Sequence, residues 1–422
     1  MTHAQHTLAT PARRALATMT VLTSICLAAC GGGGGASAEA PLATSPNTAG
    51  AVGSGSTGNT NDPSTDSTPA TGGPAQPGDG SGVAGPVAPG GDFPVGATPS
   101  QPTPRLALGA QWLETGPLAD WWTAAASGDG QVLAMAVNPG GLYLSHDAGA
   151  TWEPQAGAGQ GNWSSIDMDP SGTHIAASSF GGLLWVSHDG GASWEGKFHD
   201  CHWLGVTLSN NGQRLAAVAK FGPLFTSDDG GASWVPRLPT GDWQAVAGSE
   251  DGRVLLTAAH DGPIQVSTDF GQTWTAREQS RGWYRLAISA EGQHMAAAEN
   301  GGQIHVSSDF GQTWTATFQS LPVTALSMTR DGRQLVVAVP ISGKVTTDAG
   351  LYYSGDFGQT WQALATPRTW RAAALSGDGN ALVAAARGEG VDPMAIAPGL
   401  PGGHIFVTRA SAVTASAGSA SH

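Results

Sequence analysis

The sequence predicts an all-β protein, a single seven-bladed β-propeller, and three observations lead to this prediction. From about residue 105 the chain repeats with a period of about 40 residues, a length typical of propellers and other repeat architectures. The repeats carry two series of tryptophans at fixed places, and short apolar runs between glycine turns have the length of single strands. Four short strands in a repeat, counted seven times, make a propeller.

The first tryptophan series ends a motif, Ser-x-Asp-x-Gly-x-Thr/Ser-Trp, that occurs six times. An aspartate carboxylate in this pattern accepts hydrogen bonds from its own turn, and glycine supplies the positive φ that the turn needs. Each copy offers only one carboxylate, too few oxygen ligands for calcium. We therefore predict a structural role for the motif aspartates, which are Asp147, Asp189, Asp229, Asp269, Asp309 and Asp356.

The second tryptophan series marks the first strand of each repeat. Each member stands nine residues before a turn glycine, and Val323 takes its place in the sixth repeat, so the count of inner strands is seven. Small residues follow these tryptophans along the strand, as in Trp203-Leu-Gly205, which favours close packing between blades. We expect these tryptophans in the core: Trp121, Trp163, Trp203, Trp243, Trp283 and Trp370.

The ring is expected to close with a strand from the N-terminal end of the domain. The last repeat ends at residues 405–408 and has no tryptophan of the first series after it. Trp112 lies nine residues before Trp121, the spacing that also separates Trp194 from Trp203. The segment at residues 110–114 is therefore predicted to complete the last blade, leaving no open edge strand.

The repeated motif resembles the Asp-box, or BNR, repeat of sialidases, xyloglucanases, sortilin-type receptors and photosystem II assembly factors. In size and repeat number the domain is similar to the photosystem II assembly factors. That resemblance implies a propeller tethered outside the cytoplasm that binds segments of nascent membrane proteins. It covers nearly all of residues 110–408, but through motifs that specify a fold and leave the partner open.

The N-terminus predicts export. Arg13 and Arg14 precede a short apolar run, so residues 1–29 are expected to be a secretory signal peptide. The ending Leu27-Ala-Ala-Cys30 resembles the bacterial lipobox, which implies that Cys30 is lipidated and anchors the chain to a membrane. Gly31 follows where inner-membrane retention would have Asp, so we expect an outer-membrane lipoprotein, periplasm-facing or on the cell surface.

The rest of the chain divides by composition. Residues 30–104 hold the lipidated cysteine and a Gly/Ser/Pro/Thr-rich stretch that cannot bury a core, so a disordered tether is expected. The propeller is predicted over residues 105–410 and a flexible tail over 411–422. With the signal removed and Cys30 acylated, Cys201 is expected to have no disulfide partner in the mature chain.

The predicted function is a cell-envelope binding scaffold that holds a protein or polysaccharide on one face of the propeller. This face carries the connections between blades and between the second and third strands of each blade, with long insertions at residues 340–350 and 388–403. Short loops on it place the candidate ligand-binding residues Phe180, Lys220, Phe221, His260, Glu299 and Arg387. A net charge of −14 predicts no nucleic-acid partner. We expect a monomer without cofactor.

Two alternatives stay open. Asp-box families include glycosidases, so a glycoside hydrolase or lyase acting on an envelope polysaccharide would use a carboxylate pair on the same face. No catalytic residue is assigned, because the sequence does not say which carboxylates face each other. His199, Cys201 and His202 resemble metal ligands, but a stable site needs further ligands from elsewhere, and no metal is predicted.

Overall fold

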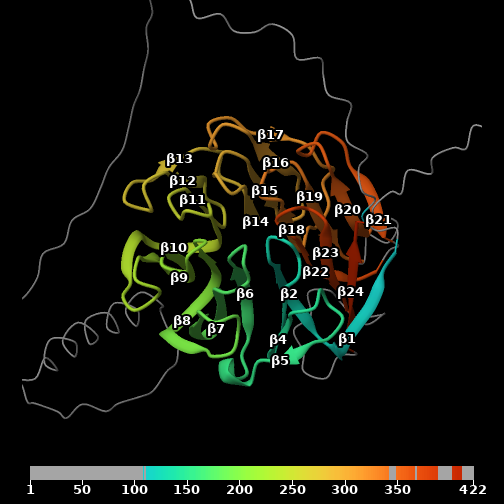
Figure 1. The fold of residues 1–422 in the computed structure, drawn as a ribbon. Coiled ribbons are helices and arrows are strands. Elements are labelled where there is room, and N and C mark those ends of the chain that lie inside the picture. Colours follow the sequence, from blue (N-terminus) through green and yellow to red (C-terminus); the bar gives the residue numbers. More distant parts are fainter. Residues whose placement is uncertain (1–107, 109–110, 342–347, 366–367, 388–401, 411–422) are drawn as a thin grey trace, which may run out of the picture. The chain divides into compact units, whose positions relative to one another are not determined.

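The computed structural model describes residues 108, 111–341, 348–365, 368–387 and 402–410, which form twenty-four β-strands and one short 3-10 helix, η1 (Ala156–Ala158). The strands pair antiparallel in sheets arranged around a common centre (Figure 1). The all-β propeller class predicted by the sequence is confirmed. No helix among the described residues has the length and apolar character needed to cross a membrane.

Three of the sheets contain four consecutive strands each and follow the same order from the centre outward. Their first strands, β2, β14 and β18, lie near the centre, and their last strands lie outside (Figure 1). The strands are β2 (Trp121–Ala126), β3 (Leu133–Val137), β4 (Leu142–Ser145) and β5 (Glu153–Pro154); β14 (Trp283–Ile288), β15 (Met295–Glu299), β16 (Ile304–Ser307) and β17 (Thr315–Ala316); β18 (Ala325–Met328), β19 (Leu335–Val339), β20 (Gly350–Ser354) and β21 (Gln362–Ala365).

A further sheet has eight strands, because four of its strands are long enough to pair with two neighbours in turn. The strand β8, for example, pairs with β7 through residues 195–202 and with β9 through residues 203–208. The eight strands are β6 (Trp163–Met168), β7 (Ile175–Ser187), β8 (Glu195–Leu208), β9 (Leu215–Ser227), β10 (Val235–Gly248), β11 (Leu255–Ala259), β12 (Ile264–Ser267) and β13 (Thr275–Ala276).

The remaining sheet joins the two ends of the propeller. It contains β22 (Trp370–Leu375), β23 (Ala381–Ala386) and β24 (Gly403–Arg409), and β1 (Leu113–Ala119) pairs with β24 as its outermost strand. The closing strand thus begins one residue after Trp112 and extends beyond the predicted segment. Trp112 itself packs against Trp370 and Phe406, with ring centroids 6.1 and 6.5 Å apart.

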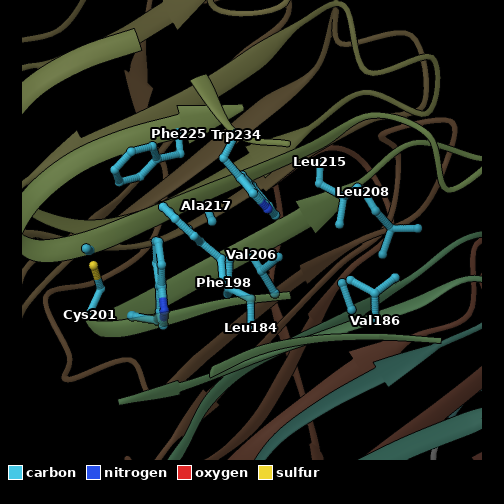
Figure 2. Close-up of a cluster of buried hydrophobic side chains, with 13 residues drawn as sticks. Leu184, Val186, Phe198, Cys201, Val206, Leu208, Leu215, Ala217, Phe225 and Trp234 are labelled. Carbon is cyan, nitrogen blue, oxygen red and sulfur yellow. The ribbon is translucent and has the colours of Figure 1, made fainter. Parts of the chain in front are cut away.

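Tryptophans of the inner strands form part of the core, as the small residues beside them predicted. All six are at most 6% exposed, and Val323 in the equivalent place is 3% exposed. Between β7, β8 and β9 one such tryptophan, Trp203, belongs to a buried cluster with Phe198, Phe225 and Trp234. Figure 2 shows this cluster, with Cys201 at its edge.

Two faces of the propeller follow from the strand order. The Asp-box turns and the turns between first and second strands lie at one end of the strands, and we call this the Asp-box face. The other end, the loop face, carries the turns between second and third strands, such as residues 138–141, 180–183 and 220–223. Of the two predicted insertions on this face, residues 342–347 and 388–401 lie outside the described residues, so their role stays a prediction.

Candidate binding site at the loop face and central channel

The Asp-box aspartates direct their carboxylates into their own turns. In the first box, Oδ1 of Asp147 accepts from the Ser145 hydroxyl and the Thr151 backbone N–H, each at 2.8 Å, and Oδ2 accepts from the Thr151 hydroxyl at 2.6 Å. The hydrogen bonds from Thr151 lower the pKa of Asp147 to about 2. The same bonds recur at the other five aspartates. A carboxylate with both oxygens engaged in this way suits a structural role.

Phe180, Lys220 and Phe221 lie on the rim of the loop face, in equivalent turns of two successive repeats. Phe180 is 38% exposed and lies opposite His202, with ring centroids 4.5 Å apart. Phe221 is 55% exposed, and the Lys220 ammonium lies 5.2 Å from its ring centroid. We call Phe180, His202, Lys220 and Phe221 the rim patch.

Phe221 has a left-handed backbone, φ +57°, which bulky residues rarely adopt. The equivalent turn residues of other repeats are Gly181, Asp261 and Gly301, and two of these three are glycines, which adopt this conformation without strain. Among the described residues, the ring contact that the structure gives Phe221 is the one with Lys220. Phe270, Phe310 and Phe357 in the Asp-box turns have the same left-handed backbone, so Phe221 is distinguished by its place on the loop face and by the exposure of its ring.

His260 and Glu299 sit on the loop face in different settings. His260 is 44% exposed and pairs with its neighbour Asp261. Glu299 is mostly enclosed: its Oε1 contacts Nε2 of His305 at 2.7 Å and accepts from Nη1 of Arg281 at 2.9 Å. Glu299 ends β15, and the loop position equivalent to His260 is Asn300, whose N–H donates to Gly282 as that of His260 does to Asp242. Glu299 therefore joins a local network on this face, and its use for a ligand stays a prediction.

Arg387 is buried, which differs from the exposed loop tip expected from the sequence. Its side chain is 1% exposed, and Nε and Nη2 donate to the two carboxylate oxygens of Asp120 at 2.6 and 2.5 Å. Arg387 follows β23 of the last sheet, whereas Asp120 lies between β1 and β2. The two-pronged ion pair therefore joins the end of the propeller to its beginning.

The central channel holds two cavities that share lining residues and that the sequence analysis did not identify. One of about 280 Å³, the upper chamber, opens toward the loop face and is lined by Trp122, Ser164, Gln244, Arg285 and Arg371 among others. The other, of about 220 Å³, the lower chamber, opens toward the Asp-box face and is lined by Asp169, Glu250 and Arg330 among others. Asp167 lines both.

The upper-chamber residues could have been found from the repeat. The position directly after each inner tryptophan changes from copy to copy, while the tryptophan itself recurs. It is Trp122, Ser164, Leu204, Gln244, Tyr284, Thr324 and Arg371 in chain order. Six of these seven residues line the upper chamber; at the fifth copy the lining residue is Arg285, one position after Tyr284.

Asp167 borders both the upper and the lower chamber of the channel. Its carboxylate accepts from the Thr207 hydroxyl at 2.9 Å and from the backbone N–H groups of Leu208 and Met168 at 3.1 and 2.9 Å. Burial nevertheless raises the pKa of Asp167 to about 6. The raised value means that burial opposes the charged form more strongly than these three bonds favour it.

Stability is expected to fall as the pH rises from about 4 to about 6, because the folded state holds the Asp167 proton more tightly than the unfolded chain does. Asp167→Asn is expected to raise the free energy of unfolding at pH 7 by about 1–3 kcal/mol and to change it little at pH 4. Urea unfolding at the two pH values measures this. Asp251→Asn is the control: despite its partial burial, hydrogen bonds from Arg253 and Ser249 lower the pKa of Asp251, so this variant should lose stability at pH 7. Equal losses at pH 7 in both variants would contradict the interpretation.

Cys201 differs from its expected state. It is 1% exposed and disulfide-bonded, whereas the mature chain was expected to leave it without a partner. That expectation assumed a removed signal and an acylated Cys30, and the structure is of the full chain. The two other cysteines, Cys26 and Cys30, lie outside the described residues. Across the described ranges, no group of three His, Cys, Asp or Glu residues is placed to hold a metal ion.

Comparisons with known proteins agree with the fold. The model of the BNR/Asp-box repeat matches residues 265–276, and no curated protein matches the sequence. The solved structure of YCF48 from Cyanidioschyzon merolae is similar at 15% identity, covering 71% of this chain and 98% of that one with a TM-score of 0.51. A structure of YCF48 bound to D1 peptide is similar at 16% identity, covering 72% and 97% with a TM-score of 0.51. U3-55K is similar at 12% identity, covering 71% and 98% with a TM-score of 0.55.

Proposed function

We propose that the protein is a binding scaffold of the bacterial cell envelope that holds a protein partner on the loop face of a seven-bladed propeller. The rim patch is the observation that carries this proposal. It combines two exposed aromatic rings, one of them on a strained turn, with a histidine and a lysine. Aromatic residues are enriched where proteins bind one another, and the structure of YCF48 with D1 peptide is a precedent for a propeller that holds a peptide.

The enzyme alternative receives no comparable support. Of the loop-face carboxylates that the structure describes, Asp120 is bound by Arg387, Glu299 by Arg281 and His305, and Asp261 by His260, while Asp242 accepts from Gln244. A neighbouring cation keeps a carboxylate ionised, so such a group is poorly placed to act as the general acid that glycoside hydrolysis needs. A polysaccharide held without hydrolysis remains compatible with the rim patch and is an outcome of the test below.

The count of seven blades is part of the proposal, and the turns at the Asp-box face support it. Every turn glycine after an inner strand packs against the residue two places beyond the turn glycine of the preceding repeat, where a Cβ would approach within 2.9 Å or less. The contacts run in a circle: Gly172–Val132, Gly212–His174, Gly252–Arg214, Gly292–Val254, Gly332–His294, Gly379–Gln334 and Gly130–Ala381. The eight-stranded sheet then corresponds to three blades joined by their long strands.

The rim patch is tested with the full chain as bait for envelope extracts and for purified envelope polysaccharides. Phe221→Gly removes the ring and relieves the left-handed strain, so the fold should stay at least as stable while capture of the partner falls by about tenfold. Asp261→Gly is the matched control, since it makes the same change at the same turn position of the next repeat. Equal capture by both variants would refute the rim patch, and capture of a polysaccharide alone would refute a protein partner.

Anchoring at Cys30 is proposed from the lipobox resemblance. Cys30→Ser is expected to move the protein from the outer-membrane fraction to the soluble fraction, because acyl chains on this residue would be lost. Sucrose-gradient fractionation followed by immunoblotting measures the distribution, with Cys201→Ser as the control that keeps Cys30. A Cys30→Ser protein that still co-sediments with outer membrane would contradict lipidation, and so would membrane loss in both variants.

A further inference from the structure

We propose that the upper chamber of the channel binds an oxyanion, the carboxylate, phosphate or sulfate group of a small molecule, between Arg285 and Arg371. This site lies in the channel and does not depend on the rim patch or on a macromolecular partner. It rests on the orientation of Arg285, the second positive charge at Arg371, and the shape and charge of the chamber.

Arg285 is held in place by uncharged oxygens. Its Nε donates to the backbone oxygen of Thr324 at 2.9 Å, Nη1 to that of Tyr284 at 3.2 Å, and Nη2 to the Tyr284 hydroxyl at 3.2 Å. The guanidinium also stacks on the Tyr284 ring at 3.8 Å. A guanidinium has five N–H groups, so two remain for a ligand while its position is fixed. Among the described residues no carboxylate pairs with Arg285, and its charge is not balanced by the fold.

Arg371 adds a second cation to the lining of the upper chamber. Its guanidinium lies 3.5 Å from the ring centroid of Trp122, and the residue is 1% exposed. Burial lowers the pKa of Arg371 to about 10; Tyr284 and Asp120 oppose the decrease, while Arg285 and Arg387 add to it. Arg371 is still charged at neutral pH, so the two cations repel each other across the chamber. An anion between them would remove this repulsion.

The excess of positive charge is local. Arg285 and Arg371 are the two cations among the residues that line the upper chamber, and Arg387 nearby is paired with Asp120. The only carboxylate among the lining residues that the structure describes is Asp167, which also borders the lower chamber. The whole chain has 18 Lys and Arg against 32 Asp and Glu, so the channel mouth is opposite in sign to the chain as a whole.

The chamber limits the size of the ligand. About 280 Å³ holds more than an inorganic anion, since one water molecule takes about 30 Å³ in the liquid. Trp122 lines the chamber beside Arg371, and Gln244 and Ser164 offer polar groups to the same space. Asp167, which borders the lower chamber, repels an anion, and this repulsion keeps the oxyanion at the loop-face end of the upper chamber. The ligand class is therefore a small organic acid or a small phosphate or sulfate ester.

Tyr284 provides a spectroscopic readout of the site. The positive charge of Arg285 lowers the pKa of the Tyr284 phenol, in spite of burial. A bound anion offsets that charge and is expected to raise this pKa, which shifts the tyrosinate absorbance titration toward higher pH. Tyr284→Phe removes this signal while Arg285 keeps its backbone partners, so the variant assigns the titration to this residue.

The test titrates the full chain with citrate, phosphate or sulfate at constant ionic strength set with chloride, following the unfolding temperature and the Tyr284 titration. We expect a saturable rise in both quantities for at least one anion, and the anion that acts identifies the source of the oxyanion. Arg285→Gln should weaken the apparent affinity by about tenfold or more. Arg253→Gln, an exposed arginine at the Asp-box face, is the control.

A second variant keeps the test decisive if Arg285→Gln unfolds. Arg285→Lys retains the positive charge but loses the planar guanidinium that can donate two parallel hydrogen bonds. This variant should remain folded and bind the anion more weakly than the unchanged protein. The proposal is overturned by an anion response that does not saturate, by equal affinities in the Arg285 and Arg253 variants, or by an unfolding temperature that rises without any shift of the Tyr284 titration.

Discussion

Replacing Arg387 with alanine is expected to destabilise the protein by about 3–5 kcal/mol, because the change leaves the Asp120 carboxylate enclosed without its cation. The Asp120 side chain is 14% exposed and that of Arg387 is 1% exposed, so water cannot fully replace the lost partner. The pair also connects the last sheet to the first inner strand across 267 residues of sequence. Urea unfolding of the full chain, followed by tryptophan fluorescence, measures the loss.

Two further variants distinguish the effect of an unpaired buried charge from the effect of losing the contact between the two ends of the propeller. Asp120→Asn should also destabilise, whereas the double replacement Arg387→Met with Asp120→Leu should recover much of the stability, since it removes both charges together. Arg253→Ala, at an exposed position, should change the free energy of unfolding by less than about 0.5 kcal/mol. If the Arg387→Ala protein is stable but no longer captures the envelope partner, Arg387 would instead be a ligand-binding residue, as the sequence predicted.

The sequence predicted those parts of the fold that repeat. The recurrence of Trp163 and Trp203 at one strand position identified buried residues, because a side chain kept in every copy serves contacts that every copy makes. The aspartate of each box could be assigned to its own turn, since its hydrogen-bond partners lie within four residues. The spacing of nine residues between Trp112 and Trp121 predicted the closing strand. In the structure this strand begins one residue after Trp112 and continues to Ala119.

The site depends on what does not repeat, and there a single sequence is less informative. Arg387 looked like an exposed loop tip because its partner Asp120 is adjacent only after the ring has closed. Arg285 and Arg371 come from different repeats, and their approach in the channel depends on the order of the blades around the centre. The turn positions in the sequence placed Phe180 and Phe221 on the loop face, where the structure has them. The left-handed backbone of Phe221 is a conformation that the residue type does not indicate.

Trp112→Ala is expected to cost about 2–3 kcal/mol, somewhat less than a fully buried tryptophan, because Trp112 is only partly covered. Its ring contacts Trp370 and Phe406, and so ties the segment before β1 to the inner and third strands of the closing sheet. The Thr115 hydroxyl adds a hydrogen bond of 2.7 Å to the backbone oxygen of Gly149 in the first Asp-box turn. Leu118→Ala is the control, since Leu118 is 62% exposed and should tolerate the change.

Deleting residues 105–118 should have a larger effect than Trp112→Ala, because it removes nearly all of β1 and leaves β24 as an open edge. That edge contains Ile405, Phe406 and Val407, which pair with Thr115, Glu114 and Leu113. An unpaired apolar strand is a template for association between chains. We therefore expect lower thermal stability together with concentration-dependent light scattering. If the deleted protein unfolds at the same temperature and stays monomeric, β1 does not close the ring, and the buried Arg387–Asp120 pair would have to hold the two ends alone.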